Sequence, residues 1–255
     1  MKALTFNERR QSQLEILKVV DEFCRKNNIK YSLAYGTLIG AIRHNGFIPW
    51  DDDIDIMMTY DNLIKLKKLF NVEGYKYLDV DTHRNYEYGF SRICNTSTFS
   101  KVGWFSKIYG VCIDVYPIIG LPNNEEIQPF FDICNIKLKH RLRFLKWRGR
   151  ILKYLHIDIL NYSNIVMNFR NYLFKYADSQ SEKVLVYGGG IRTHNVFDKS
   201  DFEEYIEKDF EGDNFYIPKK YNEILTHIYG DYMQLPPEDK RHPTHGGNYY
   251  WEEIK

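Results

Sequence analysis

Residues 36–58 read GTLIGAIRHNGFIPWDDDIDIMM and carry the strongest structural signal in the chain. Gly36 and Thr37 predict a turn, and the apolar spacing of TLIGAIRH predicts a short helix after it. The pair Asn45-Gly46 is typical of a helix end. The segment DIDIMM then alternates polar and apolar residues, which is the pattern of a strand. We therefore expect a turn, a short helix and a strand in close succession.

Four aspartates cluster at the start of this predicted strand, at positions 51, 52, 53 and 55. Because residues two apart in a strand face the same side, Asp53 and Asp55 should project together while the isoleucines beside them enter the core. Two carboxylates held a few ångströms apart repel each other unless a cation lies between them. Paired oxygen ligands suit Mg²⁺ or Mn²⁺, which commonly also bind substrate phosphates. For Asp51 and Asp52, at the entrance of the strand, a turn role is the simpler interpretation.

A third carboxylate has similar surroundings further along the chain. The segment VCIDVYP places Asp114 between two β-branched apolar residues, as an acid in an otherwise buried strand. A structural and a catalytic role are both open for it. Three carboxylates on two strands could hold two metal ions for phosphoryl transfer. The exposed N–H groups of the helix that begins after Gly36 and Thr37 would suit a phosphate.

The rest of the chain mixes helices and strands and predicts an α+β fold without internal repeats. Residues 1–121 form the expected catalytic core and residues 122–255 a mainly helical elaboration, together a single domain of 255 residues. Thr5 and Glu8 form a possible capping box at the first helix. Strands are expected at 29–35, 53–58, 75–80, 86–94 and 110–118, and helices at 5–27, 37–44, 60–70, 125–154, 158–177 and 219–229.

Composition limits the class of protein. The chain has 35 Lys+Arg against 34 Asp+Glu, so nothing global indicates a nucleic-acid partner. It has no run of about 18 apolar residues and no apolar segment near its start, so we expect neither a membrane-spanning helix nor a signal peptide. The cysteines at 24, 94, 112 and 134 form no CxxC pair. Reduced, buried thiols in a cytoplasmic protein are therefore the expectation.

A basic segment lies within the second half of the chain. Residues 137–153 carry eight Lys/Arg and no acid, interleaved with apolar residues. One interpretation is a basic helix packed by one face onto the domain. The other is a peripheral helix at the inner face of a membrane, in contact with anionic lipid or with a lipid-linked polyanionic acceptor.

Residues 36–58 closely resemble the signature of the LicD family, which is related to fukutin-related protein. They are also similar to the wider nucleotidyltransferase-fold pattern of a Gly-Thr or Gly-Ser turn, an Asp-x-Asp pair and a later single acid. The segment IDVYPI at 113–118 resembles the family's later acid strand, and residues 229–245 resemble its C-terminal segment. The resemblance covers nearly the whole chain, with no matching motif in residues 125–180. It implies a nucleotidyltransferase-like mixed sheet core with a helical C-terminal elaboration.

The resemblance also implies an activity. LicD-like proteins move phosphocholine from CDP-choline to a surface glycan such as teichoic acid or lipopolysaccharide, and fukutin-related relatives move ribitol phosphate from CDP-ribitol. By this resemblance Asp53, Asp55 and Asp114 are the metal-binding and catalytic acids, and Gly36 and Thr37 hold the donor phosphate. An acceptor hydroxyl would attack the distal phosphorus in line and CMP would leave, with Asp114 as the acid closest to that hydroxyl. The eukaryotic relatives are membrane-anchored and secretory, whereas this chain shows neither anchor nor signal.

Four further polar residues are candidates for substrate binding. Arg92 could meet the donor diphosphate or be an ordinary surface arginine. Arg43 and His44, near the end of the short helix, could face the same cleft. His245 lies in a Pro-rich tail that could form a lid over the substrate or stay solvated. Residues 188–190 are three glycines, but no Lys-Ser or Lys-Thr follows them, so a P-loop is excluded.

Aromatic residues near the motifs favour choline as the transferred head group. A quaternary ammonium has no N–H to donate, so proteins hold it with aromatic faces. Trp50 abuts the aspartate cluster, Trp104 precedes Asp114, and Tyr86 and Tyr88 precede Arg92. Each of these rings could instead be ordinary core.

Two alternatives to phosphocholine transfer are open. A nucleotidyltransferase that transfers the NMP itself to a small acceptor would use the same acids. A non-catalytic, cation-binding scaffold of glycan assembly belongs to another class, and a broken acid set would mark it. All three acids and the Gly-Thr turn are present here.

Overall fold

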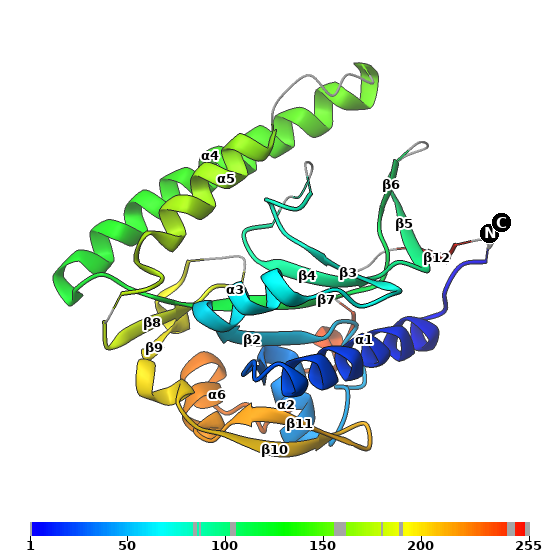
Figure 1. Cartoon of the computed structure of the whole chain (residues 1–255), viewed down its shortest axis with the longest axis horizontal. Coiled ribbons are helices and arrows are strands. Elements are labelled where there is room, and N and C mark those ends of the chain that lie inside the picture. Colours follow the sequence, from blue (N-terminus) through cyan, green and yellow to red (C-terminus); the bar gives the residue numbers. More distant parts are fainter. Residues whose placement is uncertain are drawn as a thin grey trace.

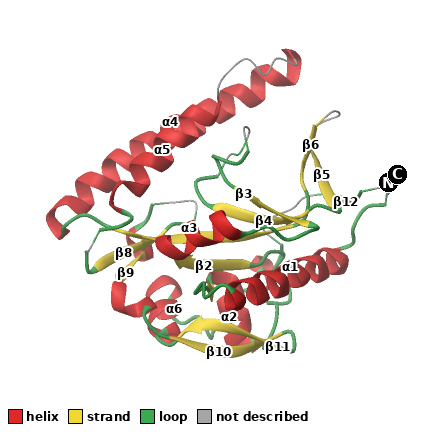
Figure 2. Cartoon of the chain, viewed as in Figure 1, coloured by secondary structure: helices red, strands yellow, loops and turns green. Residues whose placement is uncertain are grey.

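The computed structural model describes residues 2–83, 86, 88–102, 106–155, 162–179, 181–188, 191–243 and 248–252. A central sheet lies between the long pair of helices α4 and α5 on one side and helices α1, α2 and α6 on the other (Figures 1 and 2). The predicted α+β class is confirmed. Up to residue 120 the elements are α1 (Phe6–Lys26), β1 (Ser32–Leu33), α2 (Tyr35–Arg43), β2 (Asp55–Thr59), α3 (Tyr60–Leu69), β3 (Tyr75–Leu78), β4 (Ser91–Asn95), β5 (Thr98–Val102), β6 (Ser106–Tyr109) and β7 (Cys112–Gly120).

The second half of the chain begins with α4 and α5 and then returns to the sheet. Its elements are α4 (Asn124–Leu155), α5 (Tyr162–Leu173), η1 (Phe174–Tyr176), β8 (Lys183–Val186), η2 (Thr193–Asn195), β9 (Val196–Asp198), η3 (Lys199–Phe202), β10 (Tyr205–Phe210), β11 (Asp213–Pro218), α6 (Tyr221–Tyr229), η4 (Glu238–Lys240) and β12 (Tyr249–Trp251). Strands β8 to β12 were not expected from the sequence. Strands β8, β9 and β12 are only three or four residues long, and β10 and β11 pair with each other as a hairpin across Glu211 and Gly212.

The main sheet has the order β1-β2-β7-β4-β3, and β8 and β9 extend it from β7. Strands β2 and β7 run parallel, and the other pairings among the described strands of this sheet are antiparallel. Strand β12 pairs with β5 and joins a small separate sheet, so the C-terminal strand lies beside the N-terminal segment (Figure 1). The parallel pair in the middle of the main sheet is the part of the fold that positions the candidate site.

Local sequence explains where the elements of the first half begin and end. Thr5 and Glu8 form the predicted capping box, so α1 begins at Phe6. The strand expected at 29–35 is reduced to β1, because the chain turns into α2 already at Tyr35. The segment DIDIMM enters the sheet only at Asp55, so Asp53 lies in the extended approach to β2 rather than within it. The expected strand at 86–94 likewise begins only at Ser91.

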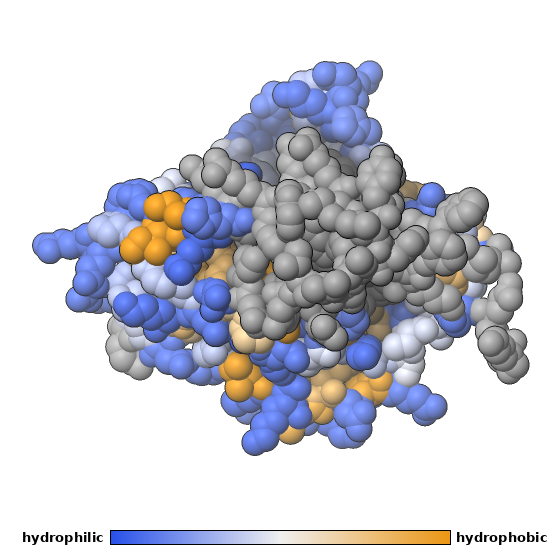
Figure 3. All heavy atoms as spheres, turned by 90° about the horizontal axis from the view of Figure 1, so that it is seen from above, coloured by the Kyte–Doolittle hydropathy of each residue, from blue (hydrophilic) through white to orange (hydrophobic). Residues whose placement is uncertain are grey.

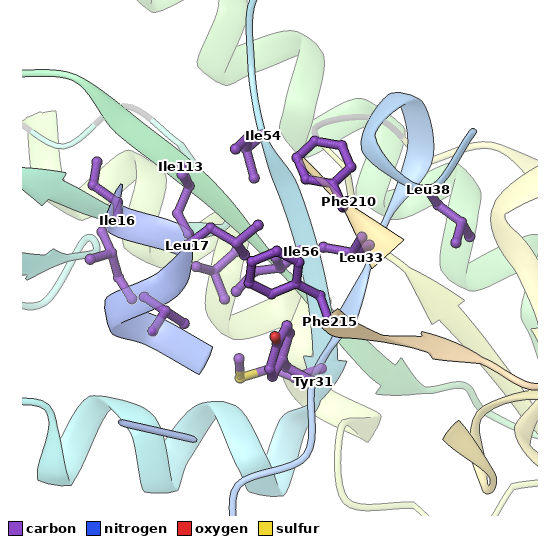
Figure 4. Close-up of a cluster of buried hydrophobic side chains, with 14 of the residues drawn as sticks. Ile16, Leu17, Tyr31, Leu33, Leu38, Ile54, Ile56, Ile113, Phe210 and Phe215 are labelled. Atoms are coloured by element: carbon purple, nitrogen blue, oxygen red, sulfur yellow. The ribbon is translucent and has the colours of Figure 1, made fainter. Parts of the chain in front are cut away.

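The core beneath the acid strand is made by the isoleucines that the alternation pointed inward. Ile54 and Ile56 are fully buried and pack with Ile113 of β7 and Leu17 of α1. Figure 4 shows these side chains meeting Phe215 of β11 on the same side of the sheet. Burying a side chain of this size contributes about 1.5–3 kcal/mol. The apolar face of β2 therefore fixes which way its acids point.

One expectation about the cysteines is wrong. Cys94 and Cys112 form a disulfide, and only Cys24 and Cys134 are free thiols. The two bonded cysteines lie directly opposite each other in the antiparallel ladder of β4 and β7. A spacing of 18 residues cannot reveal this pairing, because the register of two strands decides it.

The described residues contain no helix that is both long and apolar enough to cross a membrane. On the face seen in Figure 3, hydrophobic side chains gather only in small groups among hydrophilic ones. Helix α4 includes the basic segment 137–153. Most of the side chains of that segment lie outside the described residues, so both interpretations of it stay predictions.

Candidate active site

The parallel pairing of β2 and β7 places two of the predicted acids side by side. Asp55 and Asp114 are direct neighbours across the two strands. The N–H of Asp114 donates to the carbonyl of Ile54 at 3.0 Å, which fixes the register immediately before Asp55. Because the neighbouring isoleucines enter the core, both carboxylates face the other side of the sheet. The expected grouping of acids from two strands is therefore present, while their catalytic roles stay predictions.

The start of α2 is bonded directly to Asp55. The N–H of Ala34 donates to the carbonyl of Asp55 at 2.9 Å, and the N–H of Asp55 donates to the hydroxyl of Thr37 at 2.9 Å. Tyr35, at the junction, has φ 45°, a left-handed conformation that is uncommon for a bulky residue. Backbone strain of this kind costs about 1–3 kcal/mol and is concentrated at functional sites. Thr37 is thus a residue that positions Asp55, with its hydroxyl already engaged.

The loop before β2 brings three further carboxylates together. Asp51, Asp52 and Asp53 each offer an oxygen, and these oxygens lie within 4.8 Å of one another. Gly36 faces the same loop, because a Cβ atom built there would lie 2.6 Å from Oδ2 of Asp51. Only glycine leaves the Asp51 carboxylate this close to the start of α2. The glycine in the motif therefore makes room for an acid as well as for a turn.

Two acids at this site, Asp51 and Asp55, hold their protons unusually strongly. Burial, followed by the charge of Asp53 and a hydrogen bond to it, raises the pKa of Asp51 to about 7. Burial also raises the pKa of Asp55 well above its usual range, followed by the charges of Asp53, Asp114 and Asp51. Asp55 is 7% exposed, and among the described residues its Oδ1 atom has no hydrogen-bond donor. Carboxylates that repel one another in a buried site, with an oxygen lacking a donor, fit a divalent cation.

Helix α1 holds the acid loop mainly by its backbone. Arg10 donates from Nε to the carbonyl of Asp51 at 2.9 Å, and Gln13 donates from Nε2 to the carbonyl of Asp52 at 3.2 Å. Gln13 also donates to the carbonyl of Cys112 at 3.4 Å, so it connects the loop to the start of β7. Helix α1 also binds the carboxylate of Asp52 in this loop, whose Oδ2 lies 2.9 Å from Nη2 of Arg9. This ion pair supports the structural interpretation of Asp52.

Arg92 binds the carboxylate of Asp114, the acid that β7 contributes to the group. Its Nε lies 2.6 Å from Oδ1 of Asp114 and its Nη2 lies 3.2 Å from Oδ2. The hydroxyl of Tyr116 also donates to Oδ2 of Asp114, at 3.2 Å. Burial lowers the pKa of the Arg92 guanidinium, but Asp114 beside it raises it on balance. The structure thus places Arg92 at the acid centre, while its contact with a donor diphosphate stays a prediction.

Three other expected residues lie elsewhere or have other partners. Arg43 donates from Nη1 to the carbonyl of Tyr232 at 2.6 Å and from Nε to His44 at 3.0 Å, at the end of α2 opposite Gly36. Trp50 lies beside the acid loop, but its ring is already 5.6 Å from the guanidinium of Arg241. Trp104 and His245 lie outside the described residues.

Four residues near the acids were not expected from the sequence to take part. They are Asp51, Tyr35, Tyr116 and Tyr229. Tyr116 follows Asp114 by two residues on the same strand, so strand alternation could have revealed it. Tyr229 ends α6, and burial, followed by the charges of Asp55, Asp51 and Asp53, raises the pKa of its hydroxyl although the residue as a whole is 45% exposed. No sequence pattern indicates that α6 reaches this cluster.

Comparison with family models and comparison with individual known proteins both point to the same family. Residues 28–132 match the family model described as LicD/FKTN/FKRP, nucleotidyltransferase domain. The chain is 34% identical over 268 residues to the lipopolysaccharide cholinephosphotransferase LicD of Haemophilus influenzae, covering 96% of this chain and 97% of that protein. Shorter matches are to uncharacterized proteins of Rickettsia prowazekii, 45% identical over 58 residues, and Rickettsia typhi, 41% identical over 68 residues. These cover 23% and 26% of this chain, and 22% of each relative. The span matched by the family model contains every acid of the cluster.

Proposed function

This chain belongs to the LicD family, and on that premise we propose that it transfers phosphocholine from a CDP-linked donor to a hydroxyl of a cell-surface glycan, releasing CMP. The Haemophilus relative, which matches nearly end to end, carries lipopolysaccharide cholinephosphotransferase as its name. The observation that carries the proposal is the group of buried carboxylates at the start of β2 and β7, next to the N-terminus of α2. Such a group is unstable by itself and suits a cation-bound diphosphate.

Asp53, Asp55 and Asp114 are the residues that would hold a divalent cation, Mg²⁺ or Mn²⁺, with Asp51 as a further ligand from the same loop. The donor set consists of carboxylate oxygens, the kind that these hard cations prefer. When bound, the cation would neutralise charge that develops on the diphosphate and the leaving CMP. Asp52 is not in this set, because Arg9 already binds it.

The side chains around the acids have separate roles in the proposed reaction. Thr37 holds the backbone of Asp55 in place. The first N–H groups of α2 have no partner within the helix and are positioned for a phosphate. Arg92 is close enough to Asp114 to exchange that carboxylate for a phosphate oxygen. Asp114, next to Asp55 at the edge of the group, is our choice for the acid that accepts the proton of the attacking hydroxyl.

A panel of CDP-alcohols tests this function directly. The purified protein is incubated with Mg²⁺, a glycan acceptor that lacks phosphocholine, and CDP-choline, CDP-glycerol or CDP-ribitol. CMP should form with CDP-choline, in equal amount to phosphocholine on the glycan by mass spectrometry. Addition of EDTA should stop the reaction.

The same assay separates the alternatives. A nucleotidyltransferase proper would leave the nucleotide on the product and release no CMP. A scaffold would bind Mg²⁺ and yield no product with any donor. Turnover with CDP-ribitol alone would reject choline while keeping the transferase class.

A further inference from the structure

Arg92 is held between a carboxylate and an aromatic face. On one side it makes two bonds to Asp114. On the other, its guanidinium carbon lies 3.9 Å from the ring centre of Tyr88 and 5.6 Å from that of Phe90. A cation at this distance over a ring is strongly attracted to it. The face of Tyr88 therefore already carries a cation, the guanidinium of Arg92.

The pairing of Arg92 with Asp114 would compete with binding of the donor to Arg92 and with binding of a divalent cation to Asp114. If the proposed function holds, the donor brings a diphosphate, which is a better anionic partner for a guanidinium than a single carboxylate. A divalent cation at Asp55 would claim the neighbouring Asp114 as well, and it would repel Arg92 from the same carboxylate. Both effects favour transfer of the Arg92 guanidinium from Asp114 to a phosphate.

Once Arg92 moves, the face that it leaves is aromatic. The ring centre of Tyr88 lies 5.1 Å from that of Phe90 and 5.6 Å from that of Tyr86. Phe90 continues the row to Tyr116, at 4.8 Å, whose hydroxyl contacts Asp114. The row thus begins at the acid centre with Tyr116 and continues through Phe90 and Tyr88 to Tyr86.

We propose that Tyr88 is the specificity-determining residue for a quaternary ammonium head group. The head group would take the place of the Arg92 guanidinium on the face of the Tyr88 ring. A trimethylammonium group has no N–H to donate, so an aromatic face with a carboxylate nearby is the chemistry that recognises it. Tyr88 fits this role better than Trp50, because the arginine over its ring also binds Asp114 of the acid centre, whereas the arginine over Trp50 is Arg241, which donates to the carbonyl of Pro236. The inference rests on the proposed function for the donor, and it adds the residue that selects choline over an uncharged polyol.

The first test compares Tyr88→Leu with Tyr88→Phe, because phenylalanine keeps the aromatic face and leucine removes it. Binding of CDP-choline, CDP-glycerol and CMP is measured by calorimetry in Mg²⁺ without an acceptor. Tyr88→Leu should weaken CDP-choline binding by about tenfold and leave CDP-glycerol and CMP unchanged. Tyr88→Phe should retain the preference for choline. An equal loss for all three ligands, or none, would overturn the inference.

The second test needs neither nucleotide nor metal. Arg92→Gln removes the resident cation, so free choline should bind this variant, with aromatic fluorescence as the signal, while the unmodified protein in EDTA should not bind it. The double variant Arg92→Gln/Tyr88→Leu should lose this binding. Choline binding that survives loss of Tyr88 contradicts the inference and leaves the proposed function standing. No CDP-choline binding by the unmodified protein would instead reject the proposed donor.

Discussion

Two Asp-x-Asp segments with a β-branched residue in the middle occur in this chain, at residues 53–55 and 79–81. In the second, Nζ of Lys67 lies 2.6 Å from Oδ2 of Asp79 and also contacts Asp81. Nη1 of Arg170 lies 2.5 Å from Oδ2 of Asp81. Burial raises the pKa of Asp81, but Arg170 and Lys67 lower it on balance.

The first segment has the opposite electrostatic setting. Arg10 and the amide of Gln13, both on α1, bond to carbonyls of the loop. The carboxylate of Asp55 is instead surrounded by the charges of Asp53, Asp114 and Asp51. The pKa of Asp55 is accordingly raised instead of lowered. A pair of acids is therefore a structural ion cluster where side-chain cations reach its oxygens. It is a candidate cation site where burial and neighbouring carboxylates raise the pKa of the acid, as they do for Asp55.

Replacement of one acid in each segment should give the largest difference between the two segments. Asp55→Asn should reduce turnover by at least about a thousandfold, because loss of a metal ligand removes several kcal/mol of transition-state stabilisation and each 1.36 kcal/mol is tenfold. Asp81→Asn, the matched control, should keep turnover near that of the unmodified protein. Both are measured as CMP release at saturating donor. Near-normal rates for Asp55→Asn would contradict the metal-binding role of residues 53–55.

The pH dependence of stability should differ in sign between the two segments. The pKa of Asp51, coupled to Asp53, is about 7 in the folded state against about 3.9 unfolded. The native protein then holds more protons than the unfolded chain between these values, so the contribution of Asp51 to metal-free stability should fall as pH rises from about 4 to 7, by at most about 4 kcal/mol. The raised pKa of Asp55 adds a decline of the same sign. The pKa of Asp81 is lowered in the folded state, so the contribution of Asp81 to the free energy of unfolding should be lost only as pH falls toward that folded-state pKa.

Urea unfolding between pH 5 and 8, in EDTA and in Mg²⁺, measures this difference. Mg²⁺ should remove most of the decline, since it binds the ionised carboxylates of the native state. Asp51→Asn should flatten the decline in EDTA. A stability that rises through this range regardless of Asp51 contradicts the assignment.

The backbone anchoring of the acid loop predicts a smaller effect on activity. Gln13→Leu removes the donor that connects Asp52 to Cys112, and residues that orient metal ligands in this way typically affect metal affinity or activity by 10–100-fold. The expected result is a higher Mg²⁺ requirement with a smaller change in the KM for donor. Gln11→Leu, an exposed position on the same helix, serves as the control. An unchanged Mg²⁺ titration for Gln13→Leu would limit Gln13 to a packing role.

The smallest expected effect is on stability, at residues 79–81, whose acids are paired with Lys67 and Arg170. Lys67→Met should destabilise the fold by about 1–2 kcal/mol, because Asp79 is buried and loses one cation while Arg170 stays near both acids. Turnover should not change. Urea midpoints for the variant and for Lys68→Met, its neighbour on α3, provide the comparison; a loss of turnover specific to Lys67→Met would connect this cluster to the site.

Strand alternation predicted correctly that Asp55 and Asp114 project from buried strands, and the parallel register places them together. Their roles as metal ligands stay a prediction. The proximity of Asp51 to Gly36 depends on how the chain reverses between α2 and β2, and no spacing rule gives that path. The same limit applies to Trp50, whose partner Arg241 comes from far along the sequence. Local periodicity thus predicted what each strand presents, while the packing of distant segments decided which side chains remain uncompensated.

The parallel pairing of β2 with β7 has a consequence for how the protein folds. Asp55 and Asp114 are neighbours in space, but α3 and strands β3 to β6 lie between them in sequence. Closing so long a loop is entropically costly, and such non-local pairings form slowly. During synthesis, the acids of β2 leave the ribosome well before their partner on β7 does. A growing chain therefore carries an incomplete set of ligands until β7 docks, and pulse-labelled hydrogen exchange should show the amide of Asp114 gaining protection later than the amides of α1.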